Sequence, residues 1–206
     1  MEDHKIFWLG IPLIHRNGNV INLETRKAVA LLAYLDLSFS SPLSRESLAT
    51  LFWPEYDQQH ANANFRRSIF SINRDLGPDF IISNRETVMI NPSCVGWQDV
   101  GEFHLLLDNV GSHNHEKIVC TECITKLEKA TALYRGSFLE GLNLRDAPEF
   151  DKWQYSQRES LHQELAASLE KLTHTYASLG KFEKAIQKAR NWVNTDPFYE
   201  KSQDRK

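Results

Sequence analysis

Apolar residues recur with helical spacing through most of the chain, and short β-like runs interrupt them near the N-terminus. The most regular stretch, residues 44–77, predicts two helices joined by a tight turn. Ser44 suits the N-cap of the first, and Pro54 ends it because proline has no N–H to donate. The second is expected to start near Gln58 and to end at Gly77-Pro78. Its apolar positions form one stripe: Ala61, Phe65, Ile69, Ile72 and Leu76.

The opposite face of this second helix is polar and nearly free of carboxylates. Its amide, hydroxyl and guanidinium groups can bond phosphates and base edges: Asn62, Asn64, Arg66, Arg67, Ser68, Ser71, Asn73 and Arg74. A merely solvated face is the alternative interpretation. Two β-like runs, residues 80–82 and 87–90, then flank a turn that carries Arg85. Helix, turn, helix and basic hairpin form the outline of a winged helix-turn-helix, in which a helix enters the major groove of DNA.

Two more β-like runs, residues 6–10 and 20–23, lie before this unit. Between them Asn17-Gly18 is the strongest kind of short hairpin signal. Thr25 can cap a further helix, whose inward positions are Ala28, Leu31, Leu32 and Leu35. Arg26 and Lys27 begin that helix, where either phosphate contact or simple solvation accounts for them.

Charge limits how DNA could be bound. The chain has 206 residues and a net charge of −3, and its apolar and charged fractions, 41% and 25%, are those of a globular protein. Residues 1–95 hold nine Lys or Arg and ten Asp or Glu, so phosphate attraction must come from local clustering.

No run approaches the ~20 apolar residues of a membrane span, and no signal peptide is recognisable, so the cytoplasm is the default location. Three cysteines, an odd number, argue against a disulfide framework.

The segments KAVALLAYL, SRESLATLFWP and ANANFRRSIFSINRDLG, with a Phe-x-Leu-Gly start and the closing hairpin, resemble a known family. Over residues 5–92 their order and spacing are similar to the OmpR-type winged helix of the SARP class of antibiotic-pathway regulators. The resemblance implies that residues 58–76 are the recognition helix and that residues 80–90 are the wing. It also implies which side chains of the helix face DNA: Asn64, Arg67, Ser68, Ser71 and Arg74. The class often has more arginines late in this helix, where this chain has Phe70, Ser71 and Asn73.

Asn91-Pro92 ends the first domain, and Trp97-Gln98 suits a connecting turn before a helix. In the regulators an aspartate and an aromatic residue spaced like Asp99 and Phe103 lead into the second domain. Residues 133–154, LYRGSFLEGLNLRDAPEFDKWQ, look very like the signature of the bacterial transcriptional activator domain, the all-α partner of the winged helix in that class. Leucines and Phe138 would pack a compact loop there, and Pro148 would stand near the start of a long helix.

The long helix is expected to run to Gly180, after which the spacing of Phe182, Ala185 and Ala189 matches the second half of a tetratricopeptide repeat. A stack of helical repeats buries its last face against a cap, and the sequence offers none before Lys206. We therefore expect an N-terminal part of a longer regulator.

A separate motif, His113-x-His115-x4-Cys120-x2-Cys123, precedes the signature. Two imidazoles and two thiolates can close a tetrahedral zinc site. Alternatively the histidines are solvated loop residues, and the cysteines begin a helix with one of them packed as a small apolar group. A redox disulfide is disfavoured because the cytosol is reducing. The resemblance extends to regulators with a His/Cys-rich insert here, without indicating what it binds.

The sequence thus predicts an α+β winged helix-turn-helix over residues 1–95 and an all-α, tetratricopeptide-like domain over residues 96–206. We expect a cytoplasmic transcriptional regulator, an activator by the resemblance, that binds double-stranded promoter DNA and self-associates on it. Its helical domain would hold a second protomer, a downstream domain or RNA polymerase. The candidate DNA contacts are Asn64, Arg66, Arg67, Ser68, Ser71, Arg74, Arg85, Lys27, Ser44 and Arg45. No cofactor or enzyme activity is expected, since the chain has no P-loop, dinucleotide-binding glycines, G-x-S-x-G or H-E-x-x-H. A protein-interaction scaffold that no longer binds DNA is the alternative.

Overall fold

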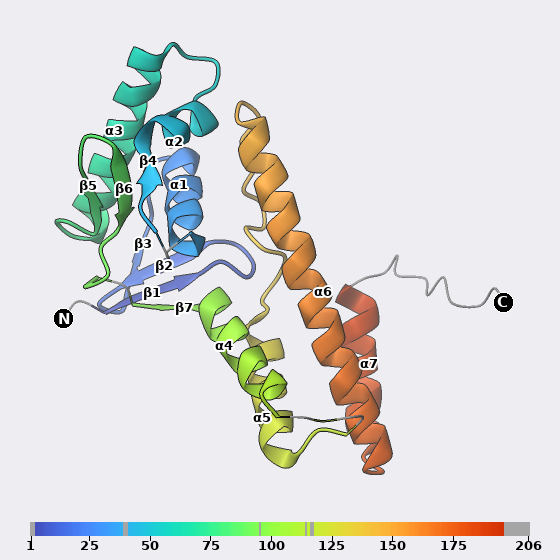
Figure 1. Cartoon of the computed structure of the whole chain (residues 1–206). Coiled ribbons are helices and arrows are strands. Elements are labelled where there is room, and N and C mark those ends of the chain that lie inside the picture. Colours follow the sequence, from blue (N-terminus) through green and yellow to red (C-terminus); the bar gives the residue numbers. More distant parts are fainter. Residues whose placement is uncertain (1–2, 39–40, 95, 114, 116–117, 196–206) are drawn as a thin grey trace. The chain divides into compact units, whose positions relative to one another are not determined.

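The computed structural model describes residues 3–38, 41–94, 96–113, 115 and 118–195 (Figure 1). The chain forms two compact units. The N-terminal unit combines the chain up to Val100 with Gly136–Gln157, and the helical unit combines Gly101–Arg135 with the chain from Arg158 onward. The predicted domain boundary at residue 95 differs from this division, because the activator-domain signature packs within the N-terminal unit. As a boundary between sequence modules it stays a prediction.

A four-stranded sheet opens the N-terminal unit, in the order β3-β2-β1-β7. Its strands are β1 His4–Phe7, β2 Leu13–Arg16, β3 Asn19–Ile21 and β7 Trp97–Gln98. Asn17 and Gly18 take positive φ angles of 52° and 79°, so the expected hairpin turn forms. It joins β2 to β3, however, and not residues 6–10 to residues 20–23, because the chain reverses once more and β1 pairs with β2. Trp97-Gln98 is likewise not a turn but a strand that pairs parallel to β1.

The helix-turn-helix and its hairpin follow the sequence closely (Figure 1). The elements are α1 Arg26–Leu37, β4 Leu43–Ser44, α2 Arg45–Phe52, α3 Gln58–Leu76, β5 Ile81–Ser83 and β6 Thr87–Ile90. Thr25 and Ser44 cap α1 and α2 as expected, each accepting a backbone N–H three residues on. Gly77 ends α3 with a φ of 121°, a conformation that favours glycine. Strands β4, β6 and β5 form a second sheet in that order.

Residues 136–157 complete the core of the N-terminal unit. Phe138 and Leu139 are fully buried, and the N–H of Leu139 donates to the carbonyl oxygen of Trp8 at 2.9 Å. The ring of Phe150 lies 5.2 Å from that of Phe52 in α2. Buried Asp99 fixes the other end of this region, since its carboxylate accepts the N–H groups of Trp8 and Leu9 at 2.8 and 2.9 Å. The resemblance placed Asp99 at the connection between the domains. In the structure this residue binds the backbone just after the end of β1.

Four helices pass through or make up the helical unit: α4 Asp99–Gly111, α5 Thr121–Leu133, α6 Pro148–Ser178 and α7 Phe182–Thr195. As predicted, α6 begins at Pro148 and is followed by Gly180 (φ 70°). One buried cluster joins residues of all four: Val110, Val119, Cys123, Ile124, Leu127, Leu172, Tyr176 and Ala185. The Tyr176 hydroxyl also donates to Glu128 Oε1 at 2.6 Å. Among the described residues, no helix is long and apolar enough to cross a membrane.

Candidate nucleic-acid interface

The exposed face of α3 carries arginines around one aromatic ring. Arg66, Arg67 and Arg74 are exposed, and Phe70 between them leaves 70% of its surface open to solvent. These four side chains, with Glu24, Ala63 and Ser71, line a shallow depression of about 520 Å³. An arginine-rich surface with an apolar centre suits a duplex, since guanidinium groups bond phosphates or guanine and a phenyl ring can pack on a thymine methyl group.

Two of the expected polar readers are largely covered, although Ser71 lines the depression. Ser68 and Ser71 are each only 8% exposed. They are buried because α3 packs against both α1 and α2. The buried face of α3 is therefore wider than the single apolar stripe that the sequence predicted. Small hydroxyl side chains tolerate such a position when they find a partner. Ser71 Oγ has one in Arg74 Nη2 at 3.5 Å.

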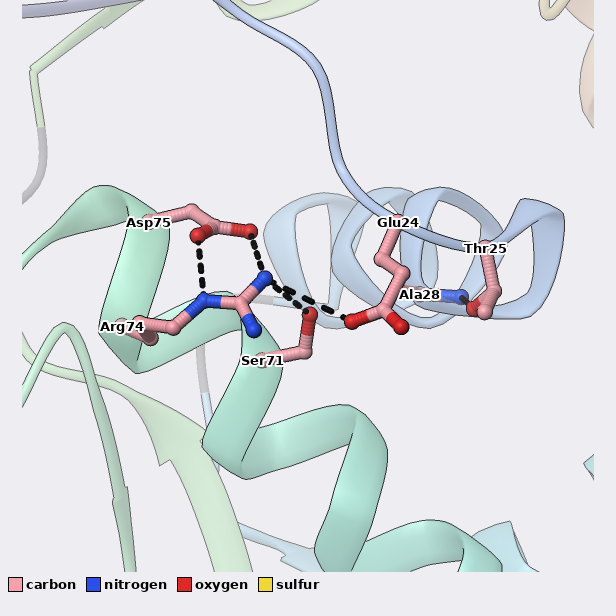
Figure 2. Close-up of polar contacts among 6 residues, drawn as sticks. All are labelled: Glu24, Thr25, Ala28, Ser71, Arg74 and Asp75. Carbon is pink, nitrogen blue, oxygen red and sulfur yellow. Dashed lines mark hydrogen bonds and ion pairs between the residues drawn. The ribbon is translucent and has the colours of Figure 1, made fainter.

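Arg74 lies between two carboxylates (Figure 2). Its Nε and Nη2 donate to the two oxygens of Asp75 at 2.8 and 3.1 Å, and Nη2 also reaches Glu24 Oε2 at 3.4 Å. The hydrogen bonds and charge of Asp75, and secondarily Glu24, raise the pKa of the guanidinium. This arginine is therefore exposed but already paired. The sequence pattern did not predict its pairing with Glu24, which lies fifty residues earlier in the chain.

The other arginines of the face are freer. Arg67 Nη1 lies 3.5 Å from Asn64 Oδ1, a contact that orients the guanidinium without neutralising it. Arg66 on α3 and Arg85 at the tip of the β5–β6 hairpin are exposed. Within the part of the chain that the structure describes, neither of them has a hydrogen-bond or ion-pair partner. These three arginines are the most available cations of the predicted set.

Ser44 and Arg45 are occupied in holding the hairpin. Ser44 pairs with Thr87 between β4 and β6, and its hydroxyl caps α2. The backbone N–H of Arg45 donates to the Glu86 carbonyl at 2.9 Å, and its guanidinium donates to the carbonyl of Asn84. Their positions are set by the fold, so any contact with phosphate would be additional to these structural contacts.

A second concave surface, of about 400 Å³, lies beside the first and shares Arg67 with it. It brings together four basic side chains from three segments, Arg26, Lys27, Arg67 and Arg145. Lys27 Nζ is held within it by Asp146 Oδ2 at 2.6 Å and the Phe52 carbonyl at 2.7 Å. Arg145 was not foreseen, because it belongs to the activator-domain signature and reaches this surface only through the packing of residues 136–157.

The His/Cys motif lies elsewhere, in the helical unit between α4 and α5. One ligand atom from each of His113, His115, Cys120 and Cys123 falls within 4.8 Å of the other three. The structure thus gathers the four residues that the sequence grouped.

Comparisons with known proteins match both parts of the chain. The family described as the bacterial transcriptional activator domain matches residues 98–205. The fold is similar to a solved structure of Mycobacterium tuberculosis EmbR in complex with a low-affinity phosphopeptide, with a TM-score of 0.69 and 17% identity. That similarity covers 97% of this chain and 52% of the EmbR chain, so the chain spans about half the length of that protein. A comparison with curated proteins gave no match.

Proposed function

Because the chain belongs to the bacterial transcriptional activator domain family, we propose that it is a DNA-binding transcriptional regulator whose helix α3 enters the major groove. The family and the EmbR-like fold point to a regulatory protein and not to an enzyme, as the sequence led us to expect. In the proposed complex the β5–β6 hairpin is the wing, and Arg85 at its tip contacts the DNA backbone or minor groove.

One observation carries this proposal: the exposed face of α3 is built from arginines around Phe70. Arg66 and Arg67 are our main phosphate or base contacts, with Asn64 supporting Arg67. Phe70 would pack on a thymine methyl group, an apolar feature of the major groove that only this base carries. Ser68 and Ser71, being buried, would act on DNA only through the arginines beside them.

The second concave surface would hold an adjoining phosphate. Arg26 and Arg145 are exposed there, and Arg67 belongs to both surfaces, so one strand of a duplex could follow the two in succession. Lys27 also lines this surface but is paired with Asp146, so it would contact a phosphate only by leaving that ion pair. In this proposal the activator-domain signature has a direct part in DNA binding, through Arg145.

The helical unit is proposed to make the protein contacts of the regulator, including self-association on DNA and contact with RNA polymerase. A stripe of large apolar side chains on α7 supports this role: Phe182, Ile186 and Val193 are 65%, 53% and 64% exposed. Exposed apolar patches of this kind mark protein interaction sites in soluble proteins. Tetratricopeptide-like stacking of a further helix on α7 would use the same stripe. A regulator of this kind would work in the cytoplasm and activate transcription.

The test is fluorescence anisotropy of the whole chain with a random-sequence duplex across a series of salt concentrations. Binding through several phosphates should weaken steeply as salt rises, because the logarithm of the affinity falls by about 0.9 per phosphate contact for each logarithmic unit of salt. Arg67→Ala should lower the affinity and reduce the slope by about 1. Lys129→Ala removes the same charge from an exposed position on α5 in the helical unit and should change neither.

The outcome also separates the proposal from its alternative. If the chain does not bind DNA even at low salt, the hypothesis of a protein-interaction scaffold is favoured, with the α7 stripe as its binding surface. If the chain binds but Arg67→Ala behaves like Lys129→Ala, DNA binding holds and our placement of the DNA-facing surface is wrong.

A further inference from the structure

We propose that His113, His115, Cys120 and Cys123 form a structural zinc site that fastens the α4–α5 connection to the core of the helical unit. No part of the proposed DNA-binding function needs this cluster.

Three sulfur–nitrogen separations within the cluster are close to those of a tetrahedral zinc site. Cys123 Sγ lies 3.2 Å from His113 Nδ1 and 3.3 Å from His115 Nε2, and Cys120 Sγ lies 3.7 Å from His113 Nδ1. With Zn–S and Zn–N bonds of about 2.3 and 2.0–2.1 Å, the edges of a tetrahedron of two sulfurs and two nitrogens are about 3.3–3.8 Å. These three sulfur–nitrogen separations lie close to that spacing, and the four ligand atoms all fall within 4.8 Å of one another.

The chemistry of the four groups also favours zinc. Two thiolates and two neutral imidazoles balance the charge of a divalent ion, and soft sulfur with nitrogen ligands in a tetrahedron selects zinc over Mg²⁺ or Ca²⁺.

Burial explains why a bound cation would matter at Cys123. This side chain is fully buried in the cluster that includes Val110, Val119 and Leu127. A thiolate is costly in such surroundings unless a positive charge lies beside it. Zinc bound at the sulfur would offset that cost and would link the apolar core to the loop that carries both histidines.

The site is closed and therefore structural. All four positions of the tetrahedron are filled by protein side chains, which leaves no open position for substrate or water, unlike catalytic zinc sites. His113 follows the end of α4, and Cys120 is the N-cap residue of α5 without a side-chain capping bond. A metal joining the two would fix the end of one helix to the start of the next.

The test measures metal content in the whole chain, purified without chelators in zinc-containing medium. We expect one zinc ion per chain by mass spectrometry of the metal, and with Co²⁺ in place of zinc we expect the spectrum of a tetrahedral site with thiolate ligands. Cys120→Ser and His113→Ala should lose the ion, with an affinity loss larger than the ten- to hundredfold typical of an outer-shell change. Cys120 is exposed, so its replacement should leave the helices intact by circular dichroism. Cys94→Ser is the matched control: Cys94 belongs to the N-terminal unit and should not affect zinc.

A chelator supplies a second readout that does not depend on the variants. Removing zinc from the unmodified chain and from Cys94→Ser should lower the thermal midpoint of unfolding, whereas Cys120→Ser should already have the lower midpoint and not respond. Three results would overturn the proposal: a chain that binds no zinc and titrates as free thiols, a Cys120–Cys123 disulfide under non-reducing mass spectrometry, or zinc retained equally by Cys120→Ser and His113→Ala.

Discussion

Asn73 of α3 makes two hydrogen bonds with the backbone of Ile81 in β5. Its Nδ2 donates to the Ile81 carbonyl oxygen at 2.9 Å, and its Oδ1 accepts the Ile81 N–H at 2.7 Å. A side-chain amide here replaces the strand partner that the edge of β5 would otherwise lack. The pair of bonds couples the proposed recognition helix directly to the proposed wing.

Asn73→Ala should therefore destabilise the fold by about 1–3 kcal/mol, because it leaves two partly buried backbone groups without partners. Unfolding in urea measures the change. Asn62→Ala makes the same substitution at a half-exposed position of the same helix and should alter the free energy of unfolding much less. Equal effects of the two substitutions would mean that the Asn73–Ile81 pair contributes nothing beyond helix propensity.

Asp75→Asn should raise the affinity for DNA. The carboxylate of Asp75 holds Arg74 in a two-bond fork, and a phosphate must compete with it for the same guanidinium. Since an exposed ion pair is worth about 0.2–1 kcal/mol, freeing Arg74 should strengthen binding by up to about fivefold. Asp79→Asn removes an equal charge from the exposed loop after α3 and corrects for the general electrostatic gain. Anisotropy at fixed salt compares the two, and identical gains would show that Arg74 does not reach DNA.

Phe70→Ala separates base recognition from charge. Loss of one apolar contact with a thymine methyl group should weaken binding to a selected operator by about fourfold, from the transfer free energy of a buried methylene. Binding to a random duplex and the salt dependence should stay unchanged, because no cation is lost. Arg66→Ala, in contrast, removes a cation and should reduce the salt dependence of binding to both duplexes. A fall in random-duplex binding for Phe70→Ala would instead indicate that the ring supports the fold of α3.

Local signals predicted much of this architecture. Thr25, Ser44 and Gly77 stand where capping chemistry puts them, and the Asn17-Gly18 turn forms as its residues require. These features depend on neighbours within a few residues, so the sequence contains what is needed to find them. The apolar spacing of α3 gave the buried stripe for the same reason.

Contacts between distant segments were not predictable in this way. The burial of Ser68 follows from two helices covering α3, and the pairing of Arg74 with Glu24 depends on where α1 begins. The strand at Trp97-Gln98 exists because β1 offers it a parallel edge. Arg145 lies on the second concave surface only because residues 136–157 pack against Trp8 and Leu9. The sequence therefore predicted the arginines of α3 as part of the proposed DNA-binding surface. It did not predict that Glu24 pairs with one of them or that Arg145 extends the surface.

Arg145→Ala tests that extension. If the second concave surface holds a phosphate, the substitution should lower affinity for any duplex and reduce the salt slope by about 1, as expected for a phosphate contact. Base preference should be unchanged because Arg145 does not lie on α3. Lys129→Ala serves again as the charge-matched control. An unchanged slope for Arg145→Ala would restrict the DNA-binding surface to α3 and the wing.

Asp36 should make the stability of the N-terminal unit depend on pH. Its carboxylate is buried and accepts the indole N–H of Trp8 at 2.6 Å, and burial raises its pKa from 3.8 to about 6 despite that bond. Between these two values the folded chain holds a proton that the unfolded chain has lost, so the contribution of Asp36 to stability falls as pH rises from about 4 to about 6. Asp36→Asn keeps an acceptor for Trp8 but cannot ionise. It should flatten this part of the stability profile and gain up to about 3 kcal/mol relative to the unmodified chain at neutral pH. Urea unfolding at a series of pH values measures both effects, and parallel profiles for the two chains would show that Asp36 does not titrate in this range.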